Sequence, residues 1–164
     1  MKTWSWLVGL VLVGGVLVLP MDARAQHRQQ AASFCLPVTN TYQDVRSNTG
    51  AIGNGGTAAM RLACPILDDG YLSKSTLYGT YVDVYDGTSS ASVDARACVT
   101  YGSFLGGSCG PASLSSMSGV SMTSLWLNIS VWGSYPWDYG YVLINLPPAQ
   151  NGRASQVHGY YLYR

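Results

Sequence analysis

Glutamate is absent from this sequence, and charged residues of either sign are scarce. Only 10% of the 164 residues are charged, and nine basic side chains against eight acidic ones give a formal net charge of +1. Binding to nucleic acid needs a surplus of positive charge to meet the phosphates, so this balance excludes a nucleic-acid partner. Disorder is excluded as well, because 12% of the residues are aromatic, whereas disordered chains contain few aromatic side chains.

Long apolar runs are also missing, except for one near the N-terminus. The uncharged run 7–19 follows Lys2, ends at Pro20 and precedes the small-x-small sequence Ala23-Arg24-Ala25. This arrangement is typical of a secretory signal peptide, so we predict cleavage after residue 25. The alternative is an uncleaved membrane anchor, but the run is shorter than the about 20 residues of a bilayer-spanning helix. We expect a secreted or periplasmic protein without stable membrane insertion after cleavage.

Strong helix formers are rare, and 19 glycines punctuate the chain. Tyrosine, valine and threonine favour strands, and several segments alternate apolar and polar residues with the period of a strand. We expect about seven strands, at 33–38, 57–64, 77–85, 91–101, 123–132, 139–146 and 155–163. Short strands separated by turn residues, with no helical segments between them, predict an all-β antiparallel sandwich of immunoglobulin-like or jelly-roll-like type.

The length suits a single domain. We divide the chain into a signal peptide at 1–25, a flexible polar arm at 26–32 and one β-sandwich domain at 33–164. No internal repeat and no second domain are visible in the sequence.

The four cysteines all follow the predicted cleavage site. An even number of cysteines in a small exported protein implies disulfides. Of the three possible pairings we favour Cys35 with Cys64 and Cys98 with Cys109, because each bridge then joins neighbouring segments of the chain. A zinc site is the alternative, but no Cys-x-x-Cys pair is present to form one.

Aromatic residues are more numerous than a small core requires. If the aliphatic residues at alternate positions from 125 to 131 face the core, Trp126 and Trp132 must face solvent. Exposed, amphipathic rings of this kind mark interaction sites, although tyrosines can also serve only to stabilise strand pairs. The predicted ligand-binding residues lie at such outward positions or around the following turn, and they are Trp126, Trp132, Trp137, Tyr81, Tyr85 and Tyr139.

Catalytic groups are few. His158 is the histidine expected to lie in an ordered strand, and the sequence has no Gly-x-Ser-x-Gly nucleophile motif. A pair of carboxylates is the other option, and Asp83 and Asp94 would lie opposite each other if 77–85 and 91–101 formed a hairpin, with Arg96 close to both. We therefore predict no catalytic residues and keep a small Asp- and His-dependent hydrolase as an alternative.

The sequence gives little support for a metal or a cofactor, and we expect neither. A structural calcium ion is the open alternative, because secreted β-sandwiches bind hard cations through aspartate and backbone oxygens in loops. Asp68, Asp69 and Asp86 are the candidate ligands, although aspartate is also common in plain turns.

The leading hypothesis is a secreted, non-catalytic binding module. Its expected partner is a glycan or other cell-surface material, and the low charge favours uncharged ligands. A structural or adhesive protein that self-associates through the same aromatic sheet face is the second hypothesis.

Overall fold

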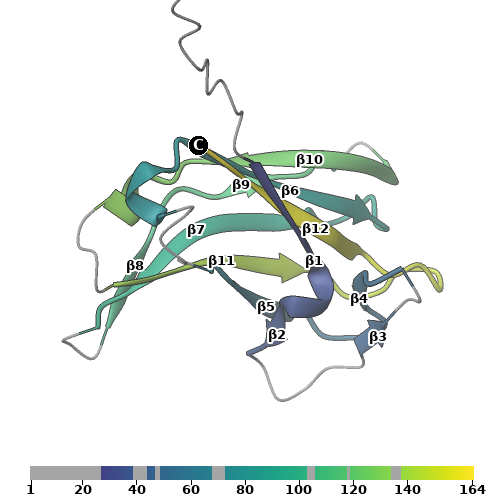
Figure 1. Ribbon diagram of the computed structural model, residues 1–164. Coiled ribbons are helices and arrows are strands. Elements are labelled where there is room, and N and C mark those ends of the chain that lie inside the picture. The colour runs from purple at the N-terminus through teal and green to yellow at the C-terminus, as the bar shows by residue number, and fades with distance from the viewer. Residues whose placement is uncertain are drawn as a thin grey trace, which may run out of the picture.

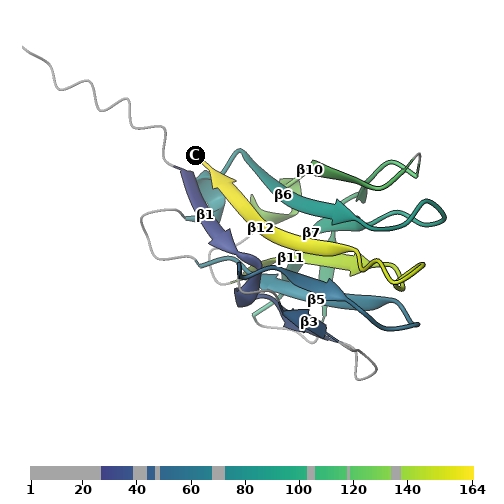
Figure 2. The same ribbon diagram turned by 90° about the vertical axis from the view of Figure 1, so that its right-hand side faces the viewer.

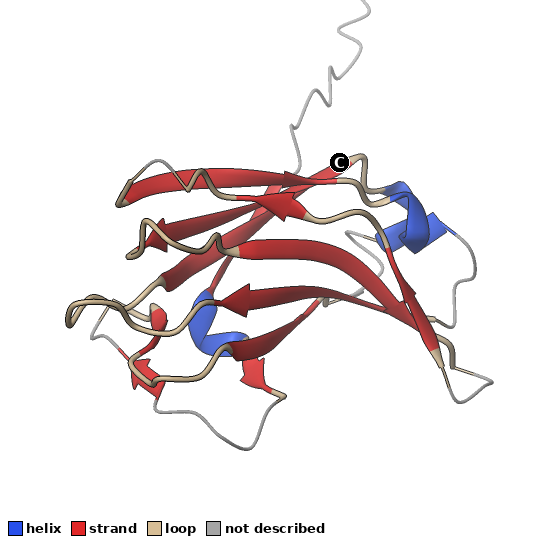
Figure 3. Ribbon diagram, turned by 180° about the vertical axis from the view of Figure 1, so that it is seen from behind, coloured by secondary structure: helices blue, strands red, loops and turns tan. Residues whose placement is uncertain are grey.

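Two antiparallel β-sheets packed face to face form the protein (Figure 1). The computed structural model describes residues 27–38, 44–46, 49–67, 73–102, 106–117, 119–133 and 138–164. The described residues contain twelve strands and three short 3-10 helices, η1 (Ala32–Phe34), η2 (Lys74–Thr76) and η3 (Ser130–Gly133). Figure 3 shows how completely strands dominate the molecule. The predicted all-β antiparallel sandwich is confirmed.

The first sheet, sheet A, runs in the order β10–β6–β12–β4–β3, and β1 also pairs with β12. Its strands are β1 (His27–Ala31), β3 (Asp44–Arg46), β4 (Ile52–Asn54), β6 (Gly79–Asp86), β10 (Ser121–Leu127) and β12 (Gln156–Tyr163). The second sheet, sheet B, runs β2–β5–β11–β7–β8, and β9 also pairs with β7. Its strands are β2 (Leu36–Pro37), β5 (Met60–Pro65), β7 (Asp94–Thr100), β8 (Gly107–Cys109), β9 (Ser113–Leu114) and β11 (Tyr139–Leu146).

The chain crosses from one sheet to the other at almost every step. Strands β4 to β7 alternate between sheets A and B, and so do β10 to β12. Each sheet therefore contains strands that are distant in sequence, as in β4–β12–β6–β10 and β5–β11–β7–β8. This is the order of a jelly roll, which is one of the two sandwich types expected.

The core lies between the two sheets and follows the predicted alternation. Leu125 and Leu127 on β10 and Val82 and Val84 on β6 point inward and are buried. The facing sheet contributes the inward residues of β5, β7 and β11: Met60, Leu62, Cys64, Ala95, Ala97, Val99, Val142, Ile144 and Leu146. Because these inward positions alternate with outward ones, the same strands also fix which side chains reach the outer faces.

Both predicted disulfides are confirmed. One bridge joins Cys35 to Cys64 and the other joins Cys98 to Cys109, and no free cysteine remains. Cys98 and Cys109 stand directly opposite each other in the β7–β8 pairing. Disulfides persist in oxidising compartments, so the bridges agree with export.

The segment 26–32 differs from the expected flexible arm. Residues His27–Ala31 form β1, which pairs over its whole length with the C-terminal half of β12, and Figure 2 shows the two strands side by side. The backbone hydrogen bonds of this pairing order a polar segment that has no apolar pattern of its own. Residues 1–25, the predicted signal peptide, lie outside the described residues. Within the part of the chain that is described, no helix has the length and apolarity needed to cross a membrane.

Candidate ligand-binding face

The outer face of sheet A is rich in aromatic side chains. The pairing of the strands places Trp126 of β10 opposite Tyr81 of β6, and Tyr81 opposite Tyr161 of β12. The neighbours of these residues along each strand, such as Leu125 and Val82, are buried in the core. Three aromatic side chains therefore form a row across three strands on the solvent side.

Ring contacts join this row to two further tyrosines. Tyr81 meets Trp126 edge to face, with ring centroids 4.6 Å apart, and meets Tyr163 in the same way at 5.5 Å. Tyr163 also contacts Tyr78, with centroids 6.3 Å apart. These are favoured distances for aromatic pairs. We call Tyr78, Tyr81, Trp126, Tyr161 and Tyr163 the aromatic face.

A glycine sets the position of the tryptophan. A Cβ atom placed on Gly79 would stand 1.8 Å from Cη2 of Trp126, so the six-membered ring of the indole lies directly over the Gly79 backbone. No other residue leaves this space free. Trp126 remains 44% exposed, which leaves part of its indole ring accessible to a ligand.

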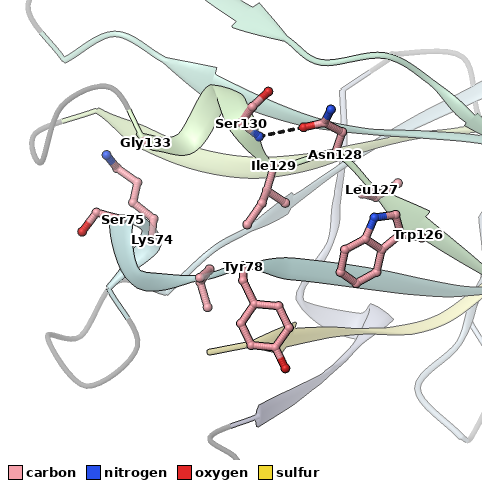
Figure 4. A pocket seen from close by; sticks show the side chains of 10 residues that line it. Lys74, Ser75, Tyr78, Trp126, Leu127, Asn128, Ile129, Ser130 and Gly133 are labelled. Carbon is pink, nitrogen blue, oxygen red and sulfur yellow. Dashed lines mark hydrogen bonds between the residues drawn. The ribbon is translucent and has the colours of Figure 1, made fainter.

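A shallow depression of about 400 Å³ lies on one side of Trp126. Figure 4 shows the Tyr78 and Trp126 rings at its border, with Asn128 and Ser130 across from them. The Asn128 side chain accepts a hydrogen bond from the Ser130 backbone N–H at 2.9 Å. The depression thus combines two aromatic rings with a polar margin, and residues of η2 and η3 complete its lining.

A second depression of about 370 Å³ lies farther along the same face, lined by Tyr81, Asp83, Ser124, Tyr161 and Tyr163. The Ser124 hydroxyl donates a hydrogen bond to the Asp83 carboxylate. A hydrogen bond from the Tyr161 phenol to the same carboxylate, together with its negative charge, raises the pKa of Tyr161. We call this depression the Asp83 pocket.

The structure unites some of the predicted site residues and separates others. Trp126 and Tyr81 are in contact, and Tyr85 lies on the same face, opposite Met122. Tyr139 is 71% exposed but belongs to β11 of sheet B, outside the aromatic face. Trp137 lies outside the described residues.

The expected outward position of Trp132 is wrong. Trp132 is fully buried, and its indole N–H donates a hydrogen bond to the Cys98 carbonyl at 2.8 Å. The strand ends at Leu127, earlier than the predicted 123–132, and the chain turns at Asn128 into η3. The period of two no longer applies beyond that turn, so Trp132 reaches the core.

Three residues of the aromatic face were not among the predicted site residues. Tyr161 and Tyr163 alternate with the inward Leu162, so the same rule that selected Trp126 would have selected them. Tyr78 precedes β6, and it reaches the face through its ring contact with Tyr163 and the hydrogen bond from its backbone N–H to the Tyr163 carbonyl. The link between these segments is the β6–β12 pairing, which joins residues about 80 positions apart in the chain.

The carboxylate pair that was considered for the alternative hydrolase does not form. Asp83 lies in β6 of sheet A and Asp94 in β7 of sheet B, so the hairpin that would have brought them together is absent. Asp94 instead accepts hydrogen bonds from the Asn145 amide and from Arg96 on sheet B. His158 is exposed where β12 shifts register against β6.

Of the candidate calcium ligands, Asp86 is the one that the structure describes, since Asp68 and Asp69 lie outside the described residues. Asp86 is fully buried and accepts hydrogen bonds from Ser115, from the Thr88 backbone N–H and from Ser155. Over the described part of the chain, no three His, Cys, Asp or Glu side chains gather as a metal site would require. The Asp86 carboxylate therefore serves as a hydrogen-bond acceptor that links the loops containing these three donor residues.

Comparison with known proteins shows a likeness to solved structures but not to a protein family. No family model and no curated protein matches the chain. Among solved structures, the chain is similar to a family two carbohydrate esterase from Cellvibrio japonicus, with a TM-score of 0.46 and 8% sequence identity. The match covers 85% of this chain and 34% of the esterase chain, so the chain spans about a third of that protein.

Proposed function

We propose that the protein is an exported, non-catalytic binding domain that recognises carbohydrate through the aromatic face of sheet A. The observation that supports this most directly is the continuous group formed by Trp126, Tyr81 and Tyr163. The Tyr81 ring contacts the rings of both other residues on the outer face of the sheet. Depressions border this group on both sides. Rigid rings next to polar pockets suit a ligand with alternating apolar and hydroxyl-bearing surfaces.

Sugar rings have this character. Their C–H faces pack on aromatic rings, while their hydroxyl groups need hydrogen-bond partners at the rim of the contact. Trp126 and Tyr81 supply ring surface, and Asn128, Ser130 and Ser124 stand beside them with polar groups. The rings are fixed by strand pairing and by each other, so binding orders few side chains, which lowers its entropic cost.

Replacement of Trp126 tests the proposal. We expect Trp126→Ala to weaken binding to soluble polysaccharides at least tenfold in calorimetry or affinity electrophoresis, because the largest ring of the face is lost. Tyr139→Ala is the matched control, since it removes an exposed aromatic residue from the other sheet. Equal binding by both variants, or no binding to any of a broad panel of polysaccharides by the wild type, would refute the proposal.

Export is the second part of the proposal. The two disulfides and the predicted signal peptide support it together. We expect N-terminal sequencing of the mature protein, recovered from the periplasm or the medium, to begin at Gln26. A mature chain that still begins at Met1 would contradict the proposed export but would not bear on the proposed carbohydrate binding.

A further inference from the structure

The Asp83 pocket contains a negative charge that no described residue neutralises. Asp83 lies on the outer face of sheet A, with Tyr81, Tyr161 and Tyr163 around it. Its hydrogen-bond donors, Ser124 and Tyr161, are neutral hydroxyl groups. The ion pair found among the described residues joins Arg96 to Asp94 on sheet B, and none reaches Asp83.

This carboxylate has room for further donors. An ionised carboxylate offers about four lone-pair positions, and the two hydroxyl groups occupy two of them. Among the other aspartates whose side chains the structure describes, Asp86 and Asp138 are buried, and Asp94 pairs with Arg96 and accepts hydrogen bonds from Asn145. Asp83 is therefore the aspartate of this group that a ligand on the aromatic face would meet.

The rings around Asp83 favour a cation. Tyr81 and Tyr163 stand at 82° to each other with centroids 5.5 Å apart, and both rings line the pocket together with the carboxylate. Positive groups are attracted to the faces of aromatic rings within about 6 Å, and a carboxylate adds direct charge pairing. The pocket, at about 370 Å³, is larger than an ammonium group alone and leaves space for the sugar ring that bears it.

We propose that the aromatic face selects a glycan with free amino groups, and that the ammonium group of one sugar unit binds Asp83 while its ring packs on Tyr81. This inference rests on the proposed carbohydrate binding and names the class of sugar. The ammonium group donates to the carboxylate, and neighbouring units extend over Trp126. An acetylated amine has no charge and would be bound more weakly.

Three oligosaccharide probes of equal length and linkage test this, namely oligomers of glucose, of N-acetylglucosamine and of glucosamine. At low salt and mildly acidic pH, we expect the glucosamine oligomer to bind the wild type at least tenfold more tightly than either neutral oligomer. Asp83→Asn should remove this preference and leave the weaker binding of neutral oligomers, because asparagine still accepts a hydrogen bond from Ser124. Asp94→Asn is the matched control, and the preference should survive it.

The outcomes separate the inference from the proposed function. If neutral oligomers bind as tightly as the glucosamine oligomer, or if Asp83→Asn keeps the preference, the inference is wrong while carbohydrate binding stands. If none of the three oligomers and no other polysaccharide binds, the proposed function fails too. Choline that competes as well as the glucosamine oligomer would show a site for cations without sugar, and this also overturns the inference.

A measurement on the wild type keeps the test valid if Asp83→Asn does not fold. Charge pairing at an exposed site is screened by salt, so the preference for the glucosamine oligomer should shrink towards one as sodium chloride is raised to molar concentration. Binding of the neutral oligomers should change little over the same range. A preference that does not respond to salt would contradict charge recognition at Asp83.

Discussion

At the scale of single residues, Gly79 determines where the Trp126 ring lies on the aromatic face without contributing a side chain to it. The indole of Trp126 occupies the space that any Cβ at this position would need. We predict that Gly79→Ala displaces the indole while the domain stays folded, because the obstructing atoms belong to the outer end of an exposed side chain. Binding should fall about as much as in Trp126→Ala, and tryptophan fluorescence should shift.

The matched control for this prediction is Gly133→Ala, since Gly133 lines the same depression as Trp126 but a Cβ there meets no atom within 4 Å. If Gly79→Ala left both the fluorescence and the binding unchanged, the position of the indole over Gly79 would not affect binding, and the prediction would be wrong. A variant that fails to fold would show that the sheet cannot release the ring, which contradicts the prediction equally.

Trp126 and Trp132 show what single positions reveal in the sequence and what they do not. Alternation places Trp126 correctly, because β10 continues to Leu127 and its inward neighbours are buried. It misplaces Trp132, because Asn128 caps a turn by accepting the Ser130 N–H. An asparagine whose side chain can accept the backbone N–H two residues on is a turn signal, but within an apolar alternating run it does not decide where the strand stops.

At the scale of strands, Tyr160 links the two sheets. Its hydroxyl, on β12 of sheet A, donates a hydrogen bond to the Pro65 carbonyl at the end of β5 of sheet B, at 2.6 Å. Burial raises the pKa of Tyr160 well above its usual value. The protonated form is thus favoured in the folded state, so this contribution to stability is complete below pH ~10, where unfolded tyrosine titrates, and declines as the pH rises from there towards the pKa of the folded state.

Tyr160→Phe tests this link. We predict a loss of about 1 kcal/mol in the free energy of unfolding at pH 7, because the Pro65 carbonyl loses its donor. Between neutral pH and pH 11, measured by urea denaturation, the variant should lose less stability than the wild type. Tyr139→Phe, at an exposed position of sheet B, should follow the wild-type curve. An equally steep alkaline decline in Tyr160→Phe would exclude Tyr160 as its source.

The strands that the sequence predicts best are those with a clear period of two. The segment 139–146 matches β11 at both ends, and 155–163 differs from β12 by one residue. The short strands β3, β4, β8 and β9 have two or three residues each, too few for any period to appear. Strand β1 was missed for another reason, since its polar residues gain order only from the pairing with β12.

At the scale of the whole molecule, the buried Asp86 holds together segments from three parts of the chain. It accepts hydrogen bonds from Ser115 before β10, from Ser155 before β12 and from Thr88 after β6. Ser115 in turn accepts the Val93 backbone N–H at 2.8 Å. Neither this hydrogen-bond network nor the order of the strands can be predicted from the sequence, because both depend on contacts between distant segments.

Replacing Asp86 tests this network. We predict that Asp86→Ala lowers the free energy of unfolding by about 3 kcal/mol, because buried donors lose their acceptor. Asp86→Asn should cost less, since it keeps one carbonyl oxygen for the Thr88 N–H. Both values come from urea denaturation. A loss below about 1 kcal/mol in Asp86→Ala would mean that the donors find other partners.

The charge on the aromatic face also bears on the hypothesis of self-association. A symmetric pairing of two copies would bring the same patch of each together, and two Asp83 carboxylates would then be buried in the same interface. Like charges brought together in this way disfavour the complex. We therefore predict a monomer by light scattering from micromolar to millimolar concentration, and some association at the upper end once Asp83→Asn removes the charge. A wild-type mass that rises with concentration and falls on Trp126→Ala would instead identify the aromatic face as an adhesive surface.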